Sequence, residues 1–570
     1  MSDEVVEATS EMTGSEALMK CLIEEGVNTI FGYPGGAIMP IYDQLYQYQE
    51  QLNHILVRHE QGAVHAAQGF ARVSGKTGVC FATSGPGATN LITGIADAMI
   101  DSTPIVCITG QVYSSLLGTD AFQETDVVGI SMPVTKWNYQ VTRAEEIPYA
   151  IARAFYIANS GRPGPVLIDI TKDAQFETFD FSYKKCDKIR SYHPYPVLQE
   201  GHVDDAVELI NKAKKPFLLV GQGVILSEAQ EELMAFAEKA GIPMAATLLG
   251  LSAVPTDHPL YVGFLGMHGN YAPNVLTNEC DVLIAVGMRF DDRVTGDLNK
   301  YAKQAKVIHI EIDASEIDKN VKTDVAIVSD AKVALTSLGK KIAANSHIEW
   351  LGEFRKLEGI EKSKIGEAVL RPTEGELKMG EVIHALSEQS AGQAIVVTDV
   401  GQHQMVASRY YQFNDPRQLV TSGGLGTMGF ALPAAMGARL GQDQKEVIAI
   451  IGDGGFQMTI QELGTIFQSK INVKILILNN HFLGMVRQWQ ELFFDKRYAS
   501  TEMVNPNFQL ITKGYGIEAR KVTDRKDLNA AIKGFLAHEG PILLEVEVER
   551  EENVFPMVPA GASVSEIRLD

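Results

Sequence analysis

Cysteine is scarce in this sequence, and the scarcity narrows the class of protein. The 570-residue chain has five cysteines, an odd number, spread over positions 21, 80, 107, 186 and 280. Such wide spacing gives neither a disulfide framework nor the paired cysteines of a zinc motif. We therefore expect a protein of a reducing compartment.

Positive charge and long apolar runs are also in short supply. Lys and Arg total 50 against 71 Asp and Glu, a formal net charge of −21. A nucleic acid or an anionic membrane would require a basic footprint, so neither is expected as a partner. No apolar run reaches the ~18 residues of a membrane span, and residues 1–12 lack the basic start of a secretory leader. We expect a cytoplasmic protein in its mature form.

What the sequence does contain is a regular alternation of apolar segments and helical patterns. The chain is 45% hydrophobic, and its length suits about three domains. The alternation predicts an α/β fold with crossover helices between parallel strands. We expect three doubly wound parallel-sheet domains at 12–180, 195–345 and 370–550, then a C-terminal arm at 551–570. Strands are predicted at 54–57, 78–82, 104–109 and 165–170, within 215–223, and at 281–287, 307–312, 394–398, 447–451 and 473–478.

The segment 447–480 is the clearest functional feature. Two apolar runs enclose a GDGG turn at 452–455 and a helical pattern, which together predict a βαβ unit. Asp453 and Asn480 would then follow neighbouring parallel strands, at the edge where doubly wound sheets bind ligands. A carboxylate and an amide oxygen suit Mg2+, and the glycines let the backbone approach phosphates at a helix N-terminus. The GDG to NN spacing matches the thiamine-diphosphate motif, whereas GDG alone would be an ordinary turn.

Glu60 follows the predicted strand at 54–57 and opens a helical pattern. An acid in a first helical turn favours the helix dipole, which is a sufficient structural reason for it. A carboxyl group also has a chemical use, because thiamine loses its C2 proton only when a carboxyl group hydrogen-bonds its aminopyrimidine ring. A glutamate partly desolvated at a subunit seam, with its pKa raised by burial, would serve.

Three further motifs accompany the GDG to NN unit. They are RHEQGAVHAAQGFARVSGKTG at 58–78, SGPGATN at 84–90 and GTDAFQETD at 118–126. Together they resemble the thiamine-diphosphate enzymes and, among them, the catalytic subunits of acetohydroxyacid synthases, also called acetolactate synthases. The resemblance extends over about residues 13–563. It implies that the three domains bind the cofactor pyrimidine, FAD and the cofactor diphosphate, in that order.

In the first domain the resemblance implies that Glu60 activates the cofactor. Phe122 and Gln123 would line the pocket near the thiazolium, and Gly36 would approach the reacting centre through its backbone. Lys172 would lie at the mouth of the substrate channel, with a solvated surface lysine as the alternative.

In the middle domain, residues 221–223 form only a GxG pattern, which an ordinary strand-to-helix turn also has. The segments LGMHG at 265–269, GMRFDDRVTG at 287–296 and IEID at 310–313 resemble the flavin-binding stretches of acetohydroxyacid synthases. Arg289 is expected also to reach the carboxylate of the second 2-oxo acid; a flavin-phosphate contact or a structural ion pair are the alternatives. The residues assigned to FAD are Gly221, Gln222, Gly223, Leu265, Gly266, Met267, His268, Gly287, Arg289, Asp291, Arg293, Asp313, Ile317 and Asp330.

In the third domain the resemblance implies sites for the diphosphate and Mg2+. Met428 would wedge under the cofactor, where a soft, unbranched side chain suits an aromatic ring, and simple core filling is the alternative. Mg2+ would take the backbone carbonyl of Phe482 as its third protein ligand, after Asp453 and Asn480. The residues assigned to thiamine diphosphate are Gly401, Gln402, His403, Gly426, Met428, Gly454, Gly455 and Met485.

The second substrate is expected to meet the segment MVRQWQ at 485–490. Trp489 resembles the family tryptophan that favours 2-oxobutyrate over pyruvate, and one methylene is worth only ~1–3 kcal/mol, so the preference would be graded. Val486 and Met267 are assigned to the same substrate region. The stretch 555–563 looks able to fold over the site and exclude water.

The implied function is that of an acetohydroxyacid synthase. Pyruvate would be decarboxylated on thiamine diphosphate and joined to a second pyruvate or to 2-oxobutyrate. The products, 2-acetolactate and 2-aceto-2-hydroxybutyrate, belong to the first common step of branched-chain amino-acid biosynthesis. In the family the active site lies between subunits, so a homodimer or homotetramer is implied, and a small regulatory subunit is a further candidate partner.

Two other functions compete with this interpretation. A pyruvate oxidase type of enzyme would use the same cofactors but pass electrons to FAD. A non-catalytic module would keep the fold and lose Glu60, Asp453 or Asn480, all of which are present. One departure from the family is visible at Tyr113, where proline is common, so the sequence does not predict herbicide sensitivity.

Overall fold

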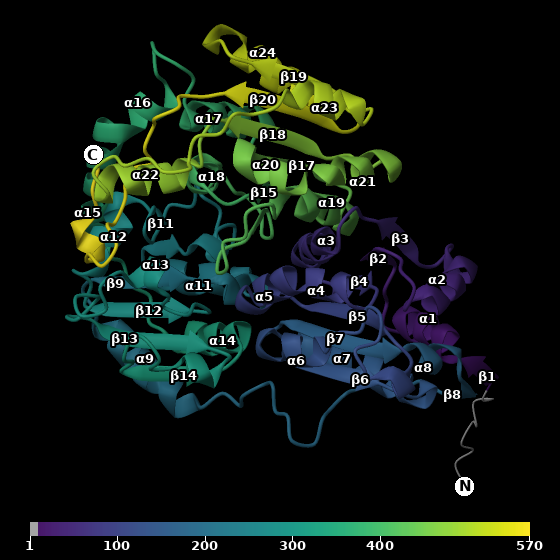
Figure 1. Ribbon diagram of the computed structural model, residues 1–570. Coiled ribbons are helices and arrows are strands. Elements are labelled where there is room, and N and C mark those ends of the chain that lie inside the picture. The colour runs from purple at the N-terminus through teal and green to yellow at the C-terminus, as the bar shows by residue number, and fades with distance from the viewer. Residues whose placement is uncertain (1–9) are drawn as a thin grey trace. The chain divides into compact units, whose positions relative to one another are not determined.

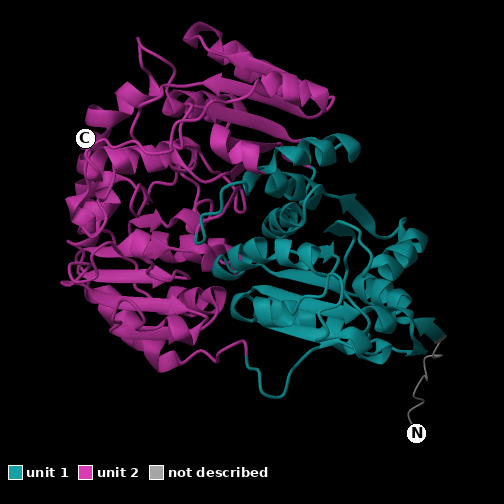
Figure 2. Ribbon diagram, viewed as in Figure 1, with its two compact units in different colours: residues 1–193, 424–443, 459–472 teal, residues 194–423, 444–458, 473–570 magenta. Residues whose placement is uncertain are grey.

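The computed structural model describes residues 10–570, which contain three six-stranded parallel sheets (Figure 1). Residues 1–9, which begin the acidic N-terminal segment considered above, lie outside the described residues. The chain divides into two compact units (Figure 2). Unit 1 comprises residues 1–193, 424–443 and 459–472, and unit 2 comprises 194–423, 444–458 and 473–570.

The sheet of unit 1 has the strand order β3-β2-β4-β5-β7-β6. Its central strands are buried along their whole length and mostly apolar, because helices cover both faces. Leu18 of α1 and Ile151 of α7 pack with Phe81 on one face, while the Ala67 carbonyl of α3 approaches Gly78 on the other. The strands are β2 (Thr29–Gly32), β3 (Asn53–Leu56), β4 (Gly78–Ala82), β5 (Ile105–Gln111), β6 (Trp137–Val141) and β7 (Pro165–Thr171). The helices are α1 (Gly14–Glu24), α2 (Met39–Leu45), α3 (Glu60–Ser74), α4 (Pro86–Asn90), α5 (Ile92–Ile100), α6 (Val127–Ser131), α7 (Ile147–Asn159) and α8 (Lys172–Phe176).

A small antiparallel ribbon closes this first domain. Strand β1 (Ser10–Thr13) pairs with β8 (Thr178–Phe181), so the start of the described chain is held to the end of the domain. The segment between β8 and α9 (Glu200–Lys212) has no regular helix or strand.

The first sheet of unit 2 has the order β11-β10-β9-β12-β13-β14. Leu233 of α11 and Leu338 of α14 pack with Ile284 on one face, and Leu276 of α12 and Phe354 of α15 pack with Leu283 on the other. The strands are β9 (Pro216–Val220), β10 (Met244–Ala246), β11 (Tyr261–Phe264), β12 (Val282–Val286), β13 (Lys306–Glu311) and β14 (Val325–Val328). The helices are α9, α10 (Gln222–Leu226), α11 (Gln230–Ala240), α12 (Tyr271–Thr277), α13 (Asp292–Thr295), α14 (Ala331–Lys341) and α15 (Ile348–Glu361).

The second sheet of unit 2 has the order β16-β15-β17-β18-β20-β19. Val382 of α17 and Leu528 of α24 pack with Ile450 and Leu476 of its central strands. The strands are β15 (Ile395–Thr398), β16 (Leu419–Thr421), β17 (Val447–Gly452), β18 (Lys474–Asn479), β19 (Glu518–Val522) and β20 (Ile542–Glu547). The helices are α16 (Glu367–Leu370), α17 (Met379–Ser390), α18 (Gln402–Tyr410), α20 (Asp453–Thr459), α22 (Gly484–Phe493), α23 (Phe508–Gly514) and α24 (Arg525–Leu536).

Three short elements from the C-terminal part of the sequence belong to unit 1. They are α19 (Ala431–Gly441), the 3-10 helix η8 (Ile460–Glu462) and α21 (Leu463–Gln468). Helix α19 packs closely on α3, because a Cβ at Gly69 would lie 1.9 Å from the Ala434 carbonyl oxygen and one at Gly437 would lie 1.7 Å from that of Ala66. Only glycine fits at these two positions, since any side chain would overlap backbone.

The predicted fold class is confirmed by the three parallel sheets with helices on both faces. The domain boundaries given above stay predictions. No helix between residues 10 and 570 has both the length and the apolar character that crossing a bilayer requires.

Candidate active site

Glu60 is the first residue of α3 and is buried, with 8% of its surface exposed. Its Oε2 accepts a hydrogen bond from the Asn90 side-chain amide at 2.9 Å, and a Cβ at Gly87 would lie 3.2 Å from its Oε1. Asn90 and Gly87 both belong to the SGPGATN motif, which forms α4. Two of the four sequence motifs therefore meet at this carboxylate.

The AFQE segment packs on the same motif. Gln123 has a φ of +60°, a left-handed backbone conformation that is uncommon for a residue with a side chain. A Cβ at Gly85 would lie 2.8 Å from the Gln123 carbonyl oxygen, so the two loops approach through their backbones. Phe122 is 88% exposed, and a Cβ at Gly36 would meet no atom within 4 Å.

Lys172 lies beside Tyr113. Its ammonium nitrogen is 5.9 Å from the centre of the Tyr113 ring, a cation–π distance. Lys172 is half-buried as the first residue of α8, while 42% of Tyr113 is exposed. The tyrosine that departs from the family pattern is therefore a direct neighbour of the lysine assigned to the channel.

The metal ligands predicted from the GDG to NN spacing lie at one edge of a sheet. Strands β17 and β18 pair in parallel with Gly452 opposite Leu478, so Asp453 and Asn480 both follow the carboxyl ends of neighbouring strands. Asp453 and Asn480 are 1% and 3% exposed. Burial raises the pKa of Asp453, against a lowering contribution from the Asn505 hydrogen bond.

Asn505 is a residue of this edge that the sequence did not reveal. Its side-chain amide donates to Asp453 Oδ2 at 2.6 Å and to Asn479 Oδ1 at 3.0 Å, and its oxygen accepts from Gln457 at 3.0 Å. Asn505 therefore orients the acid and joins the two strand ends. It lies in a loop between α22 and α23 with no motif around it.

The residues assigned to the diphosphate begin α18. Gln402 accepts from the Asn480 amide at 3.2 Å, and a Cβ at Gly484 would lie 2.1 Å from the same Gln402 oxygen. Burial lowers the pKa of His403 to about 3, so its imidazole is neutral. His403 Nε2 has no hydrogen-bond partner, although the side chain is buried.

The loop before α19 carries the next two predicted residues. Gly426 is exposed and has a φ of +71°, and Met428 is half-buried. The loop is tied to α5 in unit 1, because Gly424 N–H donates to Asp101 at 2.7 Å and the Thr427 hydroxyl donates to Asp97 at 3.1 Å. Met428 is therefore not a fully enclosed core residue.

Helix α22 presents the residues assigned to the second substrate. Val486 is 48% exposed, and Met485 and Trp489 are half-buried. The Trp489 ring lies 5.0 Å from that of Phe493, which braces it one turn away. An apolar surface is therefore available on this helix.

The residues assigned to FAD gather at one edge of the first sheet of unit 2. Gly221 and Gly223 follow β9, and their N–H groups donate to the Val286 and Gly287 carbonyls at 2.9 and 3.0 Å. Leu265, Gly266 and His268 follow β11, Arg289 and Arg293 follow β12, Asp313 and Ile317 follow β13, and Asp330 follows β14. The carboxyl edge of a doubly wound sheet is where nucleotide ligands bind.

The polar residues of this edge differ in their contacts. Asp291, Asp313 and Asp330 cap the helices that follow them by accepting backbone N–H groups. Burial lowers the pKa of His268 to about 4. Arg289 is half-buried and makes no hydrogen bond or ion pair within residues 10–570, so its charge is available to an anion.

The C-terminal segment packs on this middle domain. Val558 N–H donates to the Met267 carbonyl at 2.8 Å, and Asp297 N–H donates to the Ala562 carbonyl at 2.9 Å. The predicted arm therefore contacts Met267, a residue assigned to both FAD and substrate.

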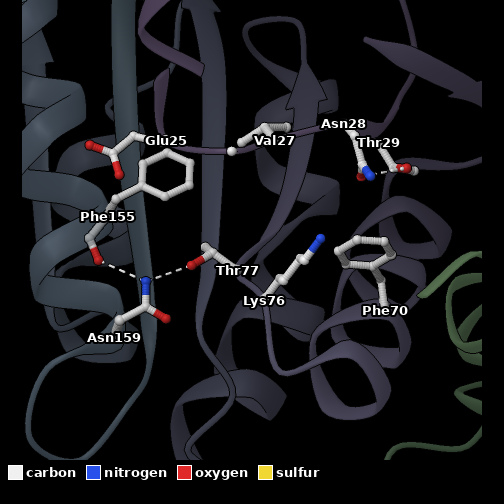
Figure 3. A pocket seen from close by; sticks show the side chains of 10 residues that line it. Glu25, Val27, Asn28, Thr29, Phe70, Lys76, Thr77, Phe155 and Asn159 are labelled. Atoms are coloured by element: carbon white, nitrogen blue, oxygen red, sulfur yellow. Dashed lines mark hydrogen bonds between the residues drawn. The ribbon is translucent and has the colours of Figure 1, made fainter. Parts of the chain in front are cut away.

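A separate pocket of about 340 Å3 lies in unit 1 (Figure 3). Glu25, Asn28 and Thr29 line it before or at the start of β2, Lys76 just before β4, and Asn159 at the end of α7. These are the amino ends of the strands, opposite to the carboxyl ends that precede Glu60 and the glycine loops. The pocket is therefore not part of the candidate active site.

The residues present fit a bound thiamine diphosphate with Mg2+. Gly452, Gly455 and Gly484 leave room where a Cβ would meet another side chain at less than 3 Å, and the unpartnered Nε2 of His403 is a ready contact for a phosphate oxygen. A carboxylate, an amide oxygen and a main-chain carbonyl are hard oxygen donors, as Mg2+ prefers. No group of three or more His, Cys, Asp or Glu side chains that could hold a metal ion occurs within residues 10–570.

Comparison with known proteins supplies the decisive observation. Three family models match: the N-terminal TPP binding domain of thiamine pyrophosphate enzymes at 12–130, their central domain at 203–338, and their C-terminal TPP binding domain at 399–546. The chain is 45% identical to the acetolactate synthase isozyme 2 large subunit of Escherichia coli K12, over 98% of this chain and 99% of the relative. It is 46% identical to the acetolactate synthase large subunit of Corynebacterium glutamicum, over 98% of this chain and 91% of the relative.

The chain belongs to the acetolactate synthase family of thiamine pyrophosphate enzymes. The probable acetolactate synthase large subunit of Methanocaldococcus jannaschii extends the similarity to an archaeon, at 44% identity over 98% of this chain. The resemblance inferred from four motifs is thereby confirmed. The two matched TPP binding domains support thiamine diphosphate, also called thiamine pyrophosphate, as the cofactor of this chain. The roles of the individual residues stay predictions.

Proposed function

We propose that the chain is an acetohydroxyacid synthase catalytic subunit. It decarboxylates pyruvate and condenses the remaining two-carbon unit with pyruvate or 2-oxobutyrate, giving 2-acetolactate or 2-aceto-2-hydroxybutyrate. This is the first common step of branched-chain amino-acid biosynthesis. The observation that carries the proposal is the identity of about 45% to acetolactate synthase large subunits over 98% of the chain.

Glu60 handles the proton that starts the reaction. When bound, thiamine diphosphate would supply a nucleophilic carbon for the 2-oxo acid carbonyl and an electron sink for the decarboxylation. The Glu60 carboxyl group, held by Asn90 at 2.9 Å, exchanges a proton with a ring nitrogen of the cofactor. Its burial supports this role, because water does not compete for the carboxyl oxygens.

Asp453, Asn480 and the Phe482 carbonyl would hold Mg2+, whose charge would neutralise the diphosphate. Gly401, Gln402 and His403 contact the phosphate oxygens at the N-terminus of α18, where the helix dipole favours negative charge. The parallel register of β17 and β18 supports the shared ion, because it brings both ligands to one edge.

Arg289 and Trp489 select the second substrate. An arginine without a protein partner suits the carboxylate of a 2-oxo acid, and the indole gives the extra methyl group of 2-oxobutyrate an apolar contact. FAD binds at the carboxyl edge of the β9 to β14 sheet through the glycines and acids described above. In this proposal the flavin stays oxidised while acetolactate forms.

The proposed active enzyme is a homodimer or homotetramer, and a small regulatory subunit is a further candidate partner. Large apolar side chains of residues 113–132 support a subunit interface, because Phe122 is 88% and Met132 65% exposed. The location is cytoplasmic. All five cysteines are free of disulfide bonds, and Cys80 Sγ donates a hydrogen bond to Cys107 Sγ at 3.2 Å.

A colorimetric acetolactate assay of the purified chain tests the function. Turnover of pyruvate should require added thiamine diphosphate and Mg2+ and yield acetolactate. Anaerobic mixing with pyruvate distinguishes a synthase from a pyruvate oxidase. Stoichiometric bleaching of the flavin without formation of acetolactate would establish an oxidase.

A further inference from the structure

Glu462 is a fully buried carboxylate with no part in the chemistry proposed above. It ends η8 in unit 1, and 0% of its surface is exposed. Its two oxygens accept from the backbone N–H of Arg58 at 3.1 and 3.2 Å, and Oε2 also accepts from the Thr465 hydroxyl at 2.7 Å. Burying a carboxylate costs free energy unless such donors surround it, so the site is built around these contacts.

The backbone that Glu462 holds leads directly to Glu60. Arg58 lies two positions before Glu60, between β3 and α3. Its side chain donates to the Gly464 carbonyl at 3.2 Å and to the Gln468 oxygen at 2.6 Å. Main chain and side chain of Arg58 are thus both fixed by one segment, η8 with α21.

The carboxylate also touches α3 on the far side of Glu60. A Cβ at Gly62 would lie 2.7 Å from Glu462 Oε1, so the first turn of the helix rests on this oxygen. A negative group is favourable there, because the N-terminus of a 15-residue helix carries partial positive charge. Glu462 therefore contacts the chain on both sides of Glu60.

We propose that Glu462 is a positioning residue that fixes the first turn of α3 and thereby aims the Glu60 carboxylate. The inference rests on the proposed role of Glu60. Glu60 meets Asn90 and Gly87 of α4 at short distances, so a small shift of the helix start misplaces its oxygens. Proton transfer is sensitive to such shifts, since a misplacement of about 1 Å can cost a hundredfold in rate.

The test is the rate at which the C2 hydrogen of bound thiamine diphosphate exchanges with deuterium, measured by quenched-flow NMR. Glu462→Ala should slow exchange about 10- to 100-fold, because it removes every acceptor of the Arg58 N–H. Glu462→Gln keeps one acceptor oxygen and should stay within about threefold of the wild type. Affinity for thiamine diphosphate with Mg2+, measured separately by fluorescence titration, should be unchanged in both.

Two reference variants make the outcomes distinguishable. Gln468→Ala loosens the same segment without touching the Arg58 backbone and should exchange at the wild-type rate. Glu60→Gln should lose exchange; if it does not, the proposed function of Glu60 fails. If Glu60→Gln loses exchange while Glu462→Ala keeps the wild-type rate, the positioning role is overturned and the role of Glu60 stands. Should Glu462→Ala fail to fold, Glu462→Asp withdraws the oxygens from Arg58, and wild-type exchange in it equally overturns the proposal.

Discussion

At the scale of single residues, the two buried acids Asp453 and Glu462 are both held by neutral donors. Asp453 accepts from the Asn505 amide, and Glu462 accepts from a backbone N–H and a hydroxyl. Neither carboxylate forms an ion pair within residues 10–570, so no cationic side chain competes for the oxygens of either acid. In the proposal that use is a metal ion for Asp453 and helix positioning for Glu462.

Asn505 should control the affinity for Mg2+. Asn505→Leu keeps the size of the side chain and removes the donor at 2.6 Å from Asp453, so the carboxylate loses its orientation. We expect the Mg2+ affinity to fall about 10- to 100-fold, the usual effect of losing a partner of a metal ligand. A Mg2+ titration of cofactor binding by fluorescence measures this. Asn507→Ala is the control, because Asn507 caps α23 instead; equal losses in both variants would contradict the assignment.

Glu462 should make stability depend on pH. Burial raises its pKa from 4.5 to about 7, so the folded state holds the proton more tightly and stability falls as pH rises between these values. The whole effect is roughly 3 kcal/mol at about 1.4 kcal/mol per pKa unit. Glu462→Gln has no proton to lose, so its melting temperature relative to the wild type should rise from pH 5.5 to pH 8. The exposed Glu374→Gln should show no such change, and an unchanging difference for Glu462→Gln would refute the prediction.

The sequence predicted the residues that belong to a spaced motif but not the single residues that hold them. Asp453 and Asn480 could be found because a fixed spacing places them after neighbouring buried strands, and sheet geometry does the rest. Asn505 is a single amide in a loop, and Glu462 is a single acid in a helical pattern that resembles a solvated face. Their partners lie 52 and 404 positions away in sequence, and no local pattern carries that information.

At the scale of elements, the α3–α19 contact depends on glycine. Gly437→Ala would place a methyl group 1.7 Å from the Ala66 carbonyl oxygen, so the helices must separate. We expect the free energy of unfolding to fall by at least about 1–3 kcal/mol, as measured by urea denaturation. Gly339→Ala in α14 is the matched control, because its Cβ meets nothing within 4 Å, and it should gain roughly 0.5–1 kcal/mol. If Gly437→Ala and Gly339→Ala changed the free energy of unfolding equally and in the same direction, the α3–α19 contact would not be tight.

Helix α18 joins two of the proposed cofactor sites. Its start carries the diphosphate residues, and Arg409 near its end donates to the His268 and Gly269 carbonyls at 3.2 and 2.7 Å and pairs with Glu361. Lysine cannot make this set of contacts, so Arg409→Lys should release the loop after β11. We expect the affinity for FAD to fall about tenfold, which is the equivalent of losing one charge-assisted hydrogen bond. Flavin fluorescence measures the affinity. The exposed Arg371→Lys is the control, and unchanged FAD affinity in Arg409→Lys would exclude the coupling.

Several buried strands were predicted close to their observed positions. Strand β4 occupies residues Gly78–Ala82 as predicted, and β17 and β18 lie within one residue of their predicted bounds, because all their residues are buried and most are apolar. Strands β2, β10, β11, β14 and β20 also had no predicted range, although β2 and β10 are buried throughout. Strands β6 and β19 escaped prediction as well. Both are edge strands with half-exposed or exposed residues, so their composition resembles that of loops.

At the scale of the whole molecule, the proposed function predicts an active site that is shared between two copies of the chain. Co-expression of Glu60→Gln and Asp453→Asn subunits tests this directly. Each variant alone should be inactive, whereas mixed dimers contain one site with both residues intact, so random pairing should restore about a quarter of wild-type activity. Acetolactate formation by the co-purified mixture is the measurement. No recovered activity in verified mixed dimers would mean that both residues act from one chain.

The passage of the chain through unit 1 in three separate stretches has a consequence for biosynthesis. Helix α3 ends at Ser74, but its partner α19 begins only at Ala431, after the entire middle domain. At about 5–20 residues per second, the ribosome needs roughly tens of seconds to supply that partner. During this time the small-residue surface of α3 that packs on α19 stays exposed on the nascent polypeptide. We therefore expect a chaperone to be needed first at this helix.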